Sequence, residues 1–135
     1  MKKPYQALIF DWDGTLADST SMIVNAVQQA FVENDFAMPS DSEASHIIGL
    51  ALPKAMQHLA PQANADEIFA LSESYKRLFL NPNNQMRLFQ DAQALLPSLK
   101  PDYWLTVATG KSRRGLDRAL TEVGLDNGFF LATRT

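Results

Sequence analysis

Residues 7–15 read ALIFDWDGT and place two aspartates directly after a short apolar run. A continuous apolar run that ends at a turn signal is typical of a buried strand, so we predict a strand over residues 5–10. Asp11 and Asp13 then lie where this strand opens into a loop. In a parallel α/β sheet the carboxyl ends of the strands form the ligand crevice. Two carboxylates there repel each other unless a cation or a shared proton offsets their charge, so we expect a divalent metal at this site.

Two plainer explanations of the acidic stretch carry less weight. Asp13-Gly14 has the composition of a simple turn, but no return strand of hairpin type follows it. A calcium-binding EF-hand loop would need glycine at its sixth position and a carboxylate at its twelfth, where this chain has Leu16 and Met22. The spacing therefore excludes the calcium loop and favours a site for chemistry.

Residues 11–19, DWDGTLADS, resemble the first motif of the haloacid dehalogenase-like superfamily, and in particular of its phosphoglycolate phosphatase-like branch. Residues 104–111, WLTVATGK, resemble the second motif of the same family, a strand that ends in Thr or Ser at the same crevice. The segment 116–125 is similar to the helix and turn that this branch places next. Two motifs in the right order are far more specific than either one alone.

The resemblance implies an α/β fold in which a partial Rossmann-like parallel sheet carries an inserted all-helical cap. Residues 1–16 and 86–135 would form the incomplete core. Residues 17–85 would form the cap, which closes over the active site and contributes to substrate choice. Within this cap, the positions near Gly49 and Leu50 correspond to substrate-facing ones.

Between the two motifs the chain shows only helical patterns, with apolar residues at three- and four-residue spacing. Ser40 and Glu43 have the spacing of a capping box, in which a hydroxyl and an acid each bond a backbone amide at the start of a helix. Residues 81–84, NPNN, stop the last of these patterns. The predicted helices begin at Ser19 or Thr20, at Ser40, near Pro53 and at residues 64–67.

After these helices the sequence predicts an alternation of helices and strands. A helix over residues 92–99 would be interrupted or kinked by Pro97. Residues 104–108 predict a second strand, and Ser112 can cap the helix that follows. The apolar run 129–131 predicts a third strand. This alternation implies parallel strands joined by right-handed crossovers.

The resemblance also implies roles for the residues at the crevice. Asp11 would be the nucleophile that accepts the phosphoryl group, and Asp13 the acid and base that protonates the leaving oxygen and later activates water. Mg²⁺ would bind a carboxylate oxygen of Asp11 and the backbone carbonyl of Asp13. Thr109 would donate its hydroxyl to a phosphate oxygen, and the amide of Gly110 would add positive potential. Lys111 is either a surface residue at the entry of the next helix or an auxiliary phosphate contact.

Other ligand sites find less support in the sequence. Gly110-Lys111-Ser112 has the ending of a nucleotide-binding P-loop, but the glycine required five residues earlier is replaced by Leu105. His46 and His58 have no paired ligand at metal-binding spacing, so we expect them at the surface or satisfied by local partners.

The composition bounds the class of protein and its partners. With 135 residues, of which 46% are hydrophobic and 20% charged, the chain is an ordinary soluble protein of one domain. A formal net charge of -3 without a basic tract argues against nucleic acid as a partner. No apolar stretch has the length of a secretion signal or a membrane span, so we expect no membrane partner and a cytoplasmic location. Without cysteine, neither a disulfide nor a thiolate metal site can form.

The sequence therefore predicts an enzyme, a magnesium-dependent phosphatase that hydrolyses a small phosphorylated metabolite through an aspartyl-phosphate. Two alternatives stay open: an inactive or weakly binding N-terminal fragment that serves in assembly, and a sugar-phosphate mutase on the same scaffold. The chain stops at Thr135, before the lysine and the acidic metal ligand of the family's third and fourth motifs. We therefore expect an uncovered sheet edge through which the chain associates with itself.

Overall fold

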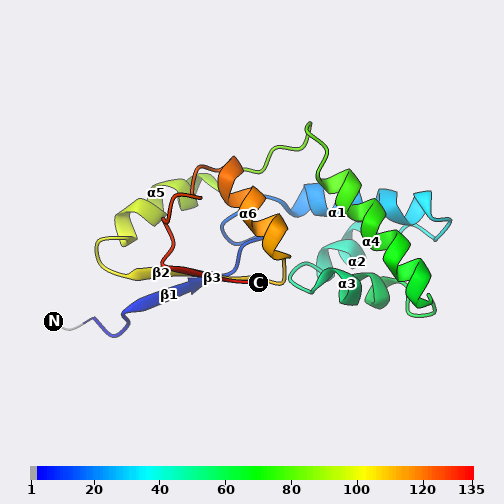
Figure 1. Cartoon of the computed structure of the whole chain (residues 1–135), viewed down its shortest axis with the longest axis horizontal. Helices are drawn as coiled ribbons and strands as arrows, with labels where there is room; N and C mark the ends of the chain where they lie inside the picture. The colour runs from blue at the N-terminus through cyan, green and yellow to red at the C-terminus, as the bar shows by residue number, and fades with distance from the viewer. Residues whose placement is uncertain (1–2) are drawn as a thin grey trace. The chain divides into compact units, whose positions relative to one another are not determined.

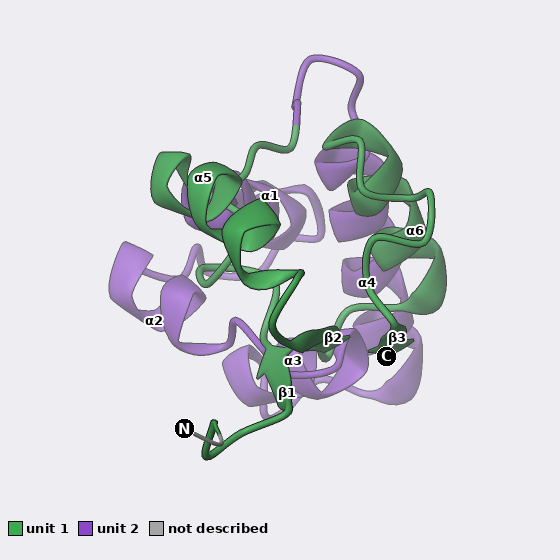
Figure 2. Cartoon of the chain, turned by 90° about the vertical axis from the view of Figure 1, so that its left-hand side faces the viewer, with its two compact units in different colours: residues 1–18, 86–135 green, residues 19–85 purple. Residues whose placement is uncertain are grey.

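The computed structural model describes residues 3–135 and divides the chain into two compact units (Figure 2). The first, here called the α/β unit, comprises Met1–Asp18 and Met86–Thr135. The second, here called the helical unit, comprises Ser19–Gln85. The helical unit is thus an insertion between the first strand and the rest of the α/β unit.

The α/β unit contains a parallel sheet of three strands in the order β1-β2-β3. These strands are β1 (Ala7–Phe10), β2 (Trp104–Ala108) and β3 (Ala132–Arg134). Two helices, α5 (Gln90–Leu99) and α6 (Arg113–Glu122), lie on the same side of this sheet (Figure 1). A parallel sheet joined through helices is an α/β fold, which confirms the predicted fold class.

Alternation along the strands separates a covered face of the sheet from an open one. Leu105 and Val107 of β2 are buried, as are the apolar residues of α5 and α6 that face the core. Trp104 of β2 is 60% exposed and Ile9 of β1 is 73% exposed. Successive side chains of a strand point to opposite faces of the sheet. Within the described residues, one face is therefore covered by the core and the other is exposed to solvent.

The third strand begins later than predicted. The sequence predicts a strand over residues 129–131, but β3 starts only at Ala132. Gly128, with a φ of 80°, belongs to the turn before it, and Phe130 is buried edge-to-face against Phe129. Of this apolar run only Phe130 packs into the core, since Leu131 is 67% exposed, and the strand itself is formed by the less apolar residues that follow.

Helix α5 also departs from expectation, because it continues through Pro97 as far as Leu99. Proline lacks an amide hydrogen and removes one bond of the helical ladder. Pro97 lies in the last turn of α5, so the helix loses little hydrogen bonding. Leu96, just before the proline, is buried in the core.

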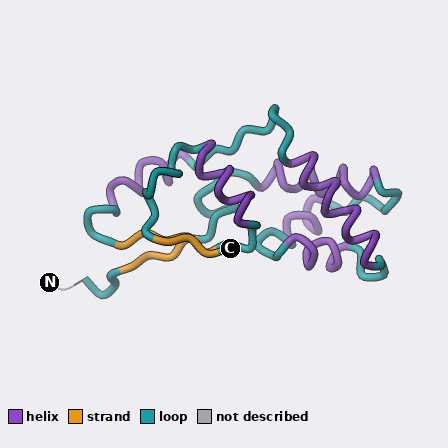
Figure 3. Tube along the Cα trace, in the orientation of Figure 1, coloured by secondary structure: helices purple, strands orange, loops and turns teal. Residues whose placement is uncertain are grey.

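The helical unit consists of helices joined by loops alone (Figure 3). They are α1 (Thr20–Glu33), α2 (Asp41–His46), α3 (Leu52–Leu59) and α4 (Ala65–Phe79). Each presents its apolar residues at helical spacing to a shared core, which is how an amphipathic helix gains most of its stability. The fully or nearly fully buried members of this core are Val27, Phe31, Ala44, Ala55, Met56 and Leu71.

Local hydrogen bonds begin two of these helices as predicted. The Ser40 hydroxyl accepts from the amide of Glu43, and the Glu43 carboxylate accepts from the amide of Ser40. The bond from the Ser40 backbone, followed by that from its side chain, lowers the pKa of the Glu43 carboxyl. Asn64 and Glu67 form a second capping box at the start of α4. Ser19 occupies the N-cap of α1, so this helix begins where the sequence predicts, although the Ser19 side chain makes no capping bond there.

One expectation about the surface is confirmed in the described residues. His46 and His58 are both exposed. None of the helices formed by residues 3–135 combines the length and the apolar character needed to cross a membrane.

Replacing Leu71 by alanine tests the core of the helical unit. Leu71 is completely buried, so Leu71→Ala should lower the free energy of unfolding by about 2–5 kcal/mol through lost burial and the cavity left behind. Phe69 lies on the same helix but is 66% exposed, and Phe69→Ala should stay within about 0.5 kcal/mol of the wild type. Urea denaturation followed by circular dichroism measures both, and equal losses would contradict this packing.

Candidate active site

The two aspartates flank a side chain that anchors the loop after β1. Trp12 is completely buried and meets Phe130 edge-to-face, with ring centroids 6.5 Å apart. Asp11 is exposed and Asp13 is only partly buried. The strand alternation thus continues past Phe10, so both carboxylates lie away from the core in which Trp12 is held.

A tight turn fixes the backbone beyond the acid pair. Gly14 has a φ of 75°, a left-handed conformation that glycine adopts without steric cost. Its amide donates to the carbonyl of Ala17 at 2.9 Å. The carbonyl of Trp12 accepts from three amides, those of Thr15, Leu16 and Ala17. This network holds the carbonyl groups of the turn in place, so the aspartates are mounted on a rigid loop.

A second loop reaches the same edge of the sheet from β2. The amide of Thr109 donates to the carbonyl of Arg134, which extends the pairing of β2 with β3 by one residue. The Thr109 hydroxyl accepts from the amide of Lys111 at 3.1 Å. Ser112 then caps α6 by accepting from the amide of Gly115. Thr109, Gly110 and Lys111 therefore form a short, hydrogen-bonded connection between the strand and the helix.

The two loops meet through an ion pair. The Lys111 Nζ lies 3.3 Å from Oδ2 of Asp13, and the side chains of this pair are only 10% and 12% exposed. The interpretation of Lys111 as a surface residue is therefore wrong, since its ammonium lies against the first acidic loop. The structure thus brings Asp13, Thr109 and Lys111 together.

Asp11 is placed at the same edge by the strand register. Phe10 is paired with Val107, so Asp11 follows at the level where β2 ends. Its Oδ1 accepts from the amide of Trp12 at 2.7 Å, which orients the carboxylate locally. Gly110 has no side chain and lies between Thr109 and Lys111. All five residues predicted for the site therefore belong to the carboxyl ends of β1 and β2.

The oxygen donors at this edge are compatible with a magnesium ion. Among residues 3–135, no cluster of three or more His, Cys, Asp or Glu side chains could hold a metal on its own. Magnesium, however, is usually held by one or two carboxylates together with substrate phosphate and water. The Asp11 carboxylate and the backbone carbonyl of Asp13, the ligands that the resemblance implies, both belong to this loop, and the ammonium beside Asp13 shows that the position accommodates positive charge.

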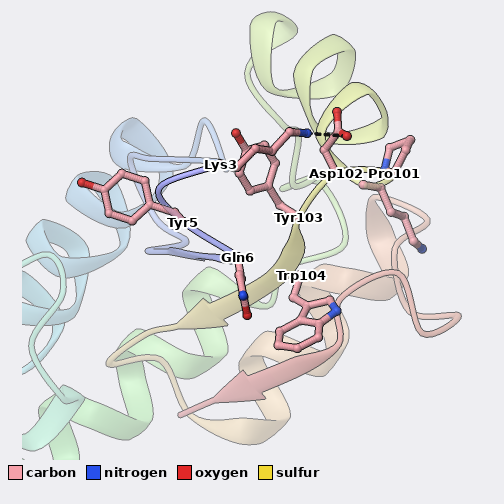
Figure 4. Close-up of a pocket in the computed structure, with 8 residues that line it drawn as sticks. Lys3, Tyr5, Gln6, Pro101, Asp102, Tyr103 and Trp104 are labelled. Carbon is pink, nitrogen blue, oxygen red and sulfur yellow. Dashed lines mark ion pairs between the residues drawn. The ribbon is translucent and has the colours of Figure 1, made fainter. Parts of the chain in front are cut away.

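A cavity of about 660 Å³ lies at the opposite end of the strands (Figure 4). Its lining includes Lys3, Tyr5, Tyr103 and Trp104. Lys3 forms an ion pair with Asp102 and lies over the ring of Tyr103. This cavity precedes β1 and β2, whereas the acid pair follows β1, so the cavity lies apart from the predicted site residues.

One residue of the site has no role in the sequence-based prediction. Gly115 lies in the first turn of α6, and a Cβ there would meet Cγ of Lys111 at 3.1 Å and Oγ of Ser112 at 3.1 Å. The only signal in the sequence is a glycine inside an otherwise regular helical pattern, where it costs roughly 0.5–1 kcal/mol relative to alanine.

A double-mutant cycle tests the contact between the loops. Lys111→Met should remove the ammonium beside the partly buried Asp13 carboxylate and so lower the free energy of unfolding, and the loss should shrink when Asp13→Asn is already present. We expect a coupling of about 1 kcal/mol between the two positions in magnesium-free urea denaturation. The exposed pair Lys3–Asp102, treated in the same way, should show a coupling of about 0.5 kcal/mol or less. Equal couplings would contradict the geometry of the acidic edge.

The fold recurs in solved structures. A haloacid dehalogenase-like family hydrolase from Streptococcus pneumoniae matches 96% of this chain with a TM-score of 0.79 and 25% identity. A predicted phosphoglycolate phosphatase from Haemophilus somnus matches the same share with a TM-score of 0.82 and 23% identity. This chain covers 60% and 62% of those two proteins, respectively.

A curated relative carries a different activity in its name. The tyrosine-protein kinase PtkA from Mycobacterium tuberculosis is 30% identical over 126 residues, which is 92% of this chain. The chain spans 42% of the length of that kinase.

A family model decides the membership of the chain. The model described as haloacid dehalogenase-like hydrolase matches residues 8–133, a range that includes the acid pair, the loop after β2 and the whole helical unit. The chain belongs to the haloacid dehalogenase-like hydrolase family.

Proposed function

We propose that the protein to which this chain belongs is a magnesium-dependent phosphatase acting on a small phosphorylated metabolite. The observation that carries the proposal is the acidic edge, where the ammonium of Lys111 lies 3.3 Å from Oδ2 of Asp13 and the backbone amide of Lys111 donates to the hydroxyl of Thr109. Carboxylates, a hydroxyl and an ammonium at one strand edge are the groups that a phosphoryl transfer needs.

In the first step, the Asp11 carboxylate attacks the phosphorus of the bound monoester. A bond forms between the Asp11 oxygen and phosphorus, and the bond from phosphorus to the ester oxygen breaks. Asp13, in its protonated form, gives its proton to the leaving oxygen. The products are an aspartyl-phosphate on Asp11 and the free alcohol. Thr109 donates its hydroxyl to the phosphoryl oxygens, which restrains the group that is transferred.

In the second step, water takes the place of the alcohol. Asp13 now accepts a proton from water as the water oxygen attacks phosphorus. The bond between phosphorus and the Asp11 oxygen breaks, which releases phosphate and restores the carboxylate. A magnesium ion bound by Asp11 and Asp13 would neutralise part of the charge of nucleophile and phosphate during both displacements.

We further propose that the helical unit is a cap that contributes to substrate choice, with residues 17–85 as the inserted segment. Gly49, with a φ of 100°, ends the turn after α2, and Leu50 beside it is 46% exposed. An apolar side chain carried on a tight turn suits contact with the non-phosphate part of a small substrate. Which metabolite it selects is open to a substrate screen.

A second candidate function is phosphoryl transfer to a protein, favoured by the 30% identity to the kinase from Mycobacterium tuberculosis. A kinase would move a phosphoryl group from a nucleoside triphosphate to a tyrosine hydroxyl in place of water. Incubation with radiolabelled ATP and a tyrosine-containing polymer separates this reaction from hydrolysis. A sugar-phosphate mutase would instead interconvert isomeric sugar phosphates without releasing phosphate.

Phosphate release from p-nitrophenyl phosphate tests the first proposal. Asp11→Asn should abolish magnesium-dependent release because the amide cannot act as the nucleophile. Asp13→Asn should lower the rate by about 10²–10⁴-fold through loss of the proton donor. Asp102→Asn, which removes a carboxylate at the other end of the strands, should leave the rate unchanged.

The assay is run on this chain and on a version extended to the length of the solved relatives. Activity in the extended version alone would favour the alternative in which these 135 residues are a weakly binding part of the enzyme. Release that persists unchanged in Asp11→Asn would refute the proposed mechanism.

The open face of the sheet generates a prediction about self-association. We propose that 135-residue chains pair through the edge strand β1 and its exposed face, because an unpaired strand edge beside apolar side chains favours association. Ile9→Lys should shift the mass measured by sedimentation equilibrium towards that of a monomer. Phe69→Lys removes an equally exposed apolar side chain from the helical unit and should not. A monomeric wild type at high concentration would contradict this idea.

A further inference from the structure

The loop that follows β2 has both of its ends tied to β3. This loop comprises residues 109–112 and is here called the β2–α6 loop. At its start, the amide of Thr109 donates to the carbonyl of Arg134 at 3.0 Å. Directly after its end, Arg113 is the first residue of α6 and donates to Thr133 at the carboxyl end of β3 (Figure 1). The two ties therefore end on neighbouring residues of one strand.

The contact of Arg113 with Thr133 consists of two hydrogen bonds. Nη1 of the arginine donates to Oγ1 of Thr133 at 2.6 Å, and Nη2 donates to the carbonyl oxygen of Thr133 at 2.9 Å. Nη1 also donates to Oδ1 of Asp117, one turn further along α6, at 3.3 Å. A guanidinium is planar and its donors have a fixed geometry. Two bonds to one residue of β3 therefore determine where the first turn of α6 lies relative to the sheet.

The first turn of α6 has this tie to the sheet before the helix reaches the core. The buried residues of α6 are Leu116, Ala119 and Leu120, which all follow the first turn. Ser112 caps the helix by accepting from the amide of Gly115, a bond that joins the loop to α6 but not to the sheet. Arg113 thus fastens to β3 the turn that directly continues the β2–α6 loop.

The place of this loop matters for the hydroxyl of Thr109. Its oxygen accepts from the amide of Lys111 at 3.1 Å. A hydroxyl carries one donor in addition to its acceptor sites, so its own hydrogen can be donated to a phosphate oxygen. A displacement of about 1 Å is enough to lengthen such a bond beyond its effective range. Phosphate binding by Thr109 therefore depends on a loop that is held at the strand ends.

A contribution to folding does not explain the bonds of Arg113. The side chains of Arg113 and Asp117 are 47% and 59% exposed, and ion pairs at such a surface contribute little to stability. What distinguishes Arg113 is its location, because its guanidinium joins the end of the β2–α6 loop to the strand that also holds the start of that loop.

We propose that Arg113 is a positioning residue for phosphate binding, which holds the β2–α6 loop in place by binding Thr133. The guanidinium is engaged by β3 and by Asp117, so it acts on phosphate through the loop and not by contact. This inference rests on the proposed phosphatase function and adds to it a residue outside the predicted site. Thr109 holds the phosphoryl group in both the bound state and the transition state. Loss of Arg113 therefore weakens binding and leaves the chemical step unchanged.

Steady-state kinetics with p-nitrophenyl phosphate and saturating magnesium test this role in whichever version of the chain hydrolyses that ester. Arg113→Met should raise KM by roughly threefold to tenfold, which corresponds to the loss of about one hydrogen bond, and should keep kcat within about twofold. A merely structural role would give the opposite split, because a smaller folded fraction lowers the apparent kcat and leaves KM unchanged. That opposite split would overturn the proposal.

Variants of Thr133 test whether Arg113 acts through the strand. Thr133→Val removes the hydroxyl and should raise KM by a smaller factor, since the bond to the carbonyl oxygen remains. Thr133→Ser retains a hydroxyl and should behave as the wild type. In the double variant of Thr133→Val with Arg113→Met, KM should equal that of Arg113→Met alone. Effects that multiply in the double variant would overturn the action through Thr133.

Two further variants separate position from charge. Arg113→Lys keeps the positive charge without the planar set of donors, so its KM should stay close to that of Arg113→Met. Arg114→Met removes the same charge from the next residue of the same turn and should keep the wild-type KM. Recovery of the wild-type KM in Arg113→Lys, or an equal rise in Arg114→Met, would show that charge alone is responsible and would overturn the proposal.

Binding of inorganic phosphate distinguishes this inference from the proposed function, because it needs no turnover. In isothermal titration calorimetry with magnesium present, Arg113→Met should raise the dissociation constant of phosphate by roughly threefold to tenfold. An unchanged constant, or no phosphate binding in either protein, would overturn the inference even if phosphate release depends on Asp11. Failure of the proposed function shows instead as phosphate release that is indifferent to Asp11→Asn.

Discussion

Repulsion between two carboxylates one residue apart is the constraint on which the site depends. Trp12, completely buried against Phe130, prevents the loop from relieving this repulsion by turning either aspartate into the core. The turn at Gly14 fixes the backbone on the other side. Lys111, in the loop after the neighbouring strand β2, places its ammonium 3.3 Å from Oδ2 of Asp13 and offsets part of this charge. The acidic spacing of the first motif is thus matched by a cation of the second.

The elements that local chemistry determines could be predicted from the sequence. Ser40 with Glu43 forms its capping box as expected, because both partners lie within one helical turn. Strand β2 matches its apolar run in full. The third strand could not be located, because Phe130 is apolar for its contact with Trp12, a residue 118 positions earlier whose proximity no local pattern reveals. The side chain of Ser19 likewise makes no cap although its type is suited to one.

The same limit applies to the site. Asp11 and Asp13 could be nominated from the sequence because they lie in the loop after a predicted strand, and Thr109 because residues 104–111 resemble the family's second motif, whose strand ends at the same edge of the sheet. The contact of Lys111 could not be derived, because a lysine at a helix entry usually extends into solvent. Only Gly115, an unfavourable residue in the first turn of α6, hinted that something must pack there. A glycine inside a helix whose backbone conformation does not require glycine can therefore mark a place where a neighbouring side chain packs against the helix.

A phosphatase and a kinase need not differ in the part of the fold described here. Both activities require a phosphoryl group to be held against positive charge while a bond to phosphorus is broken, and the acidic edge supplies the groups for this. They differ in the acceptor, which is water in one case and a hydroxyl in the other. The acceptor approaches from outside the edge formed by β1 and β2, so the residues around Asp11 do not decide between them.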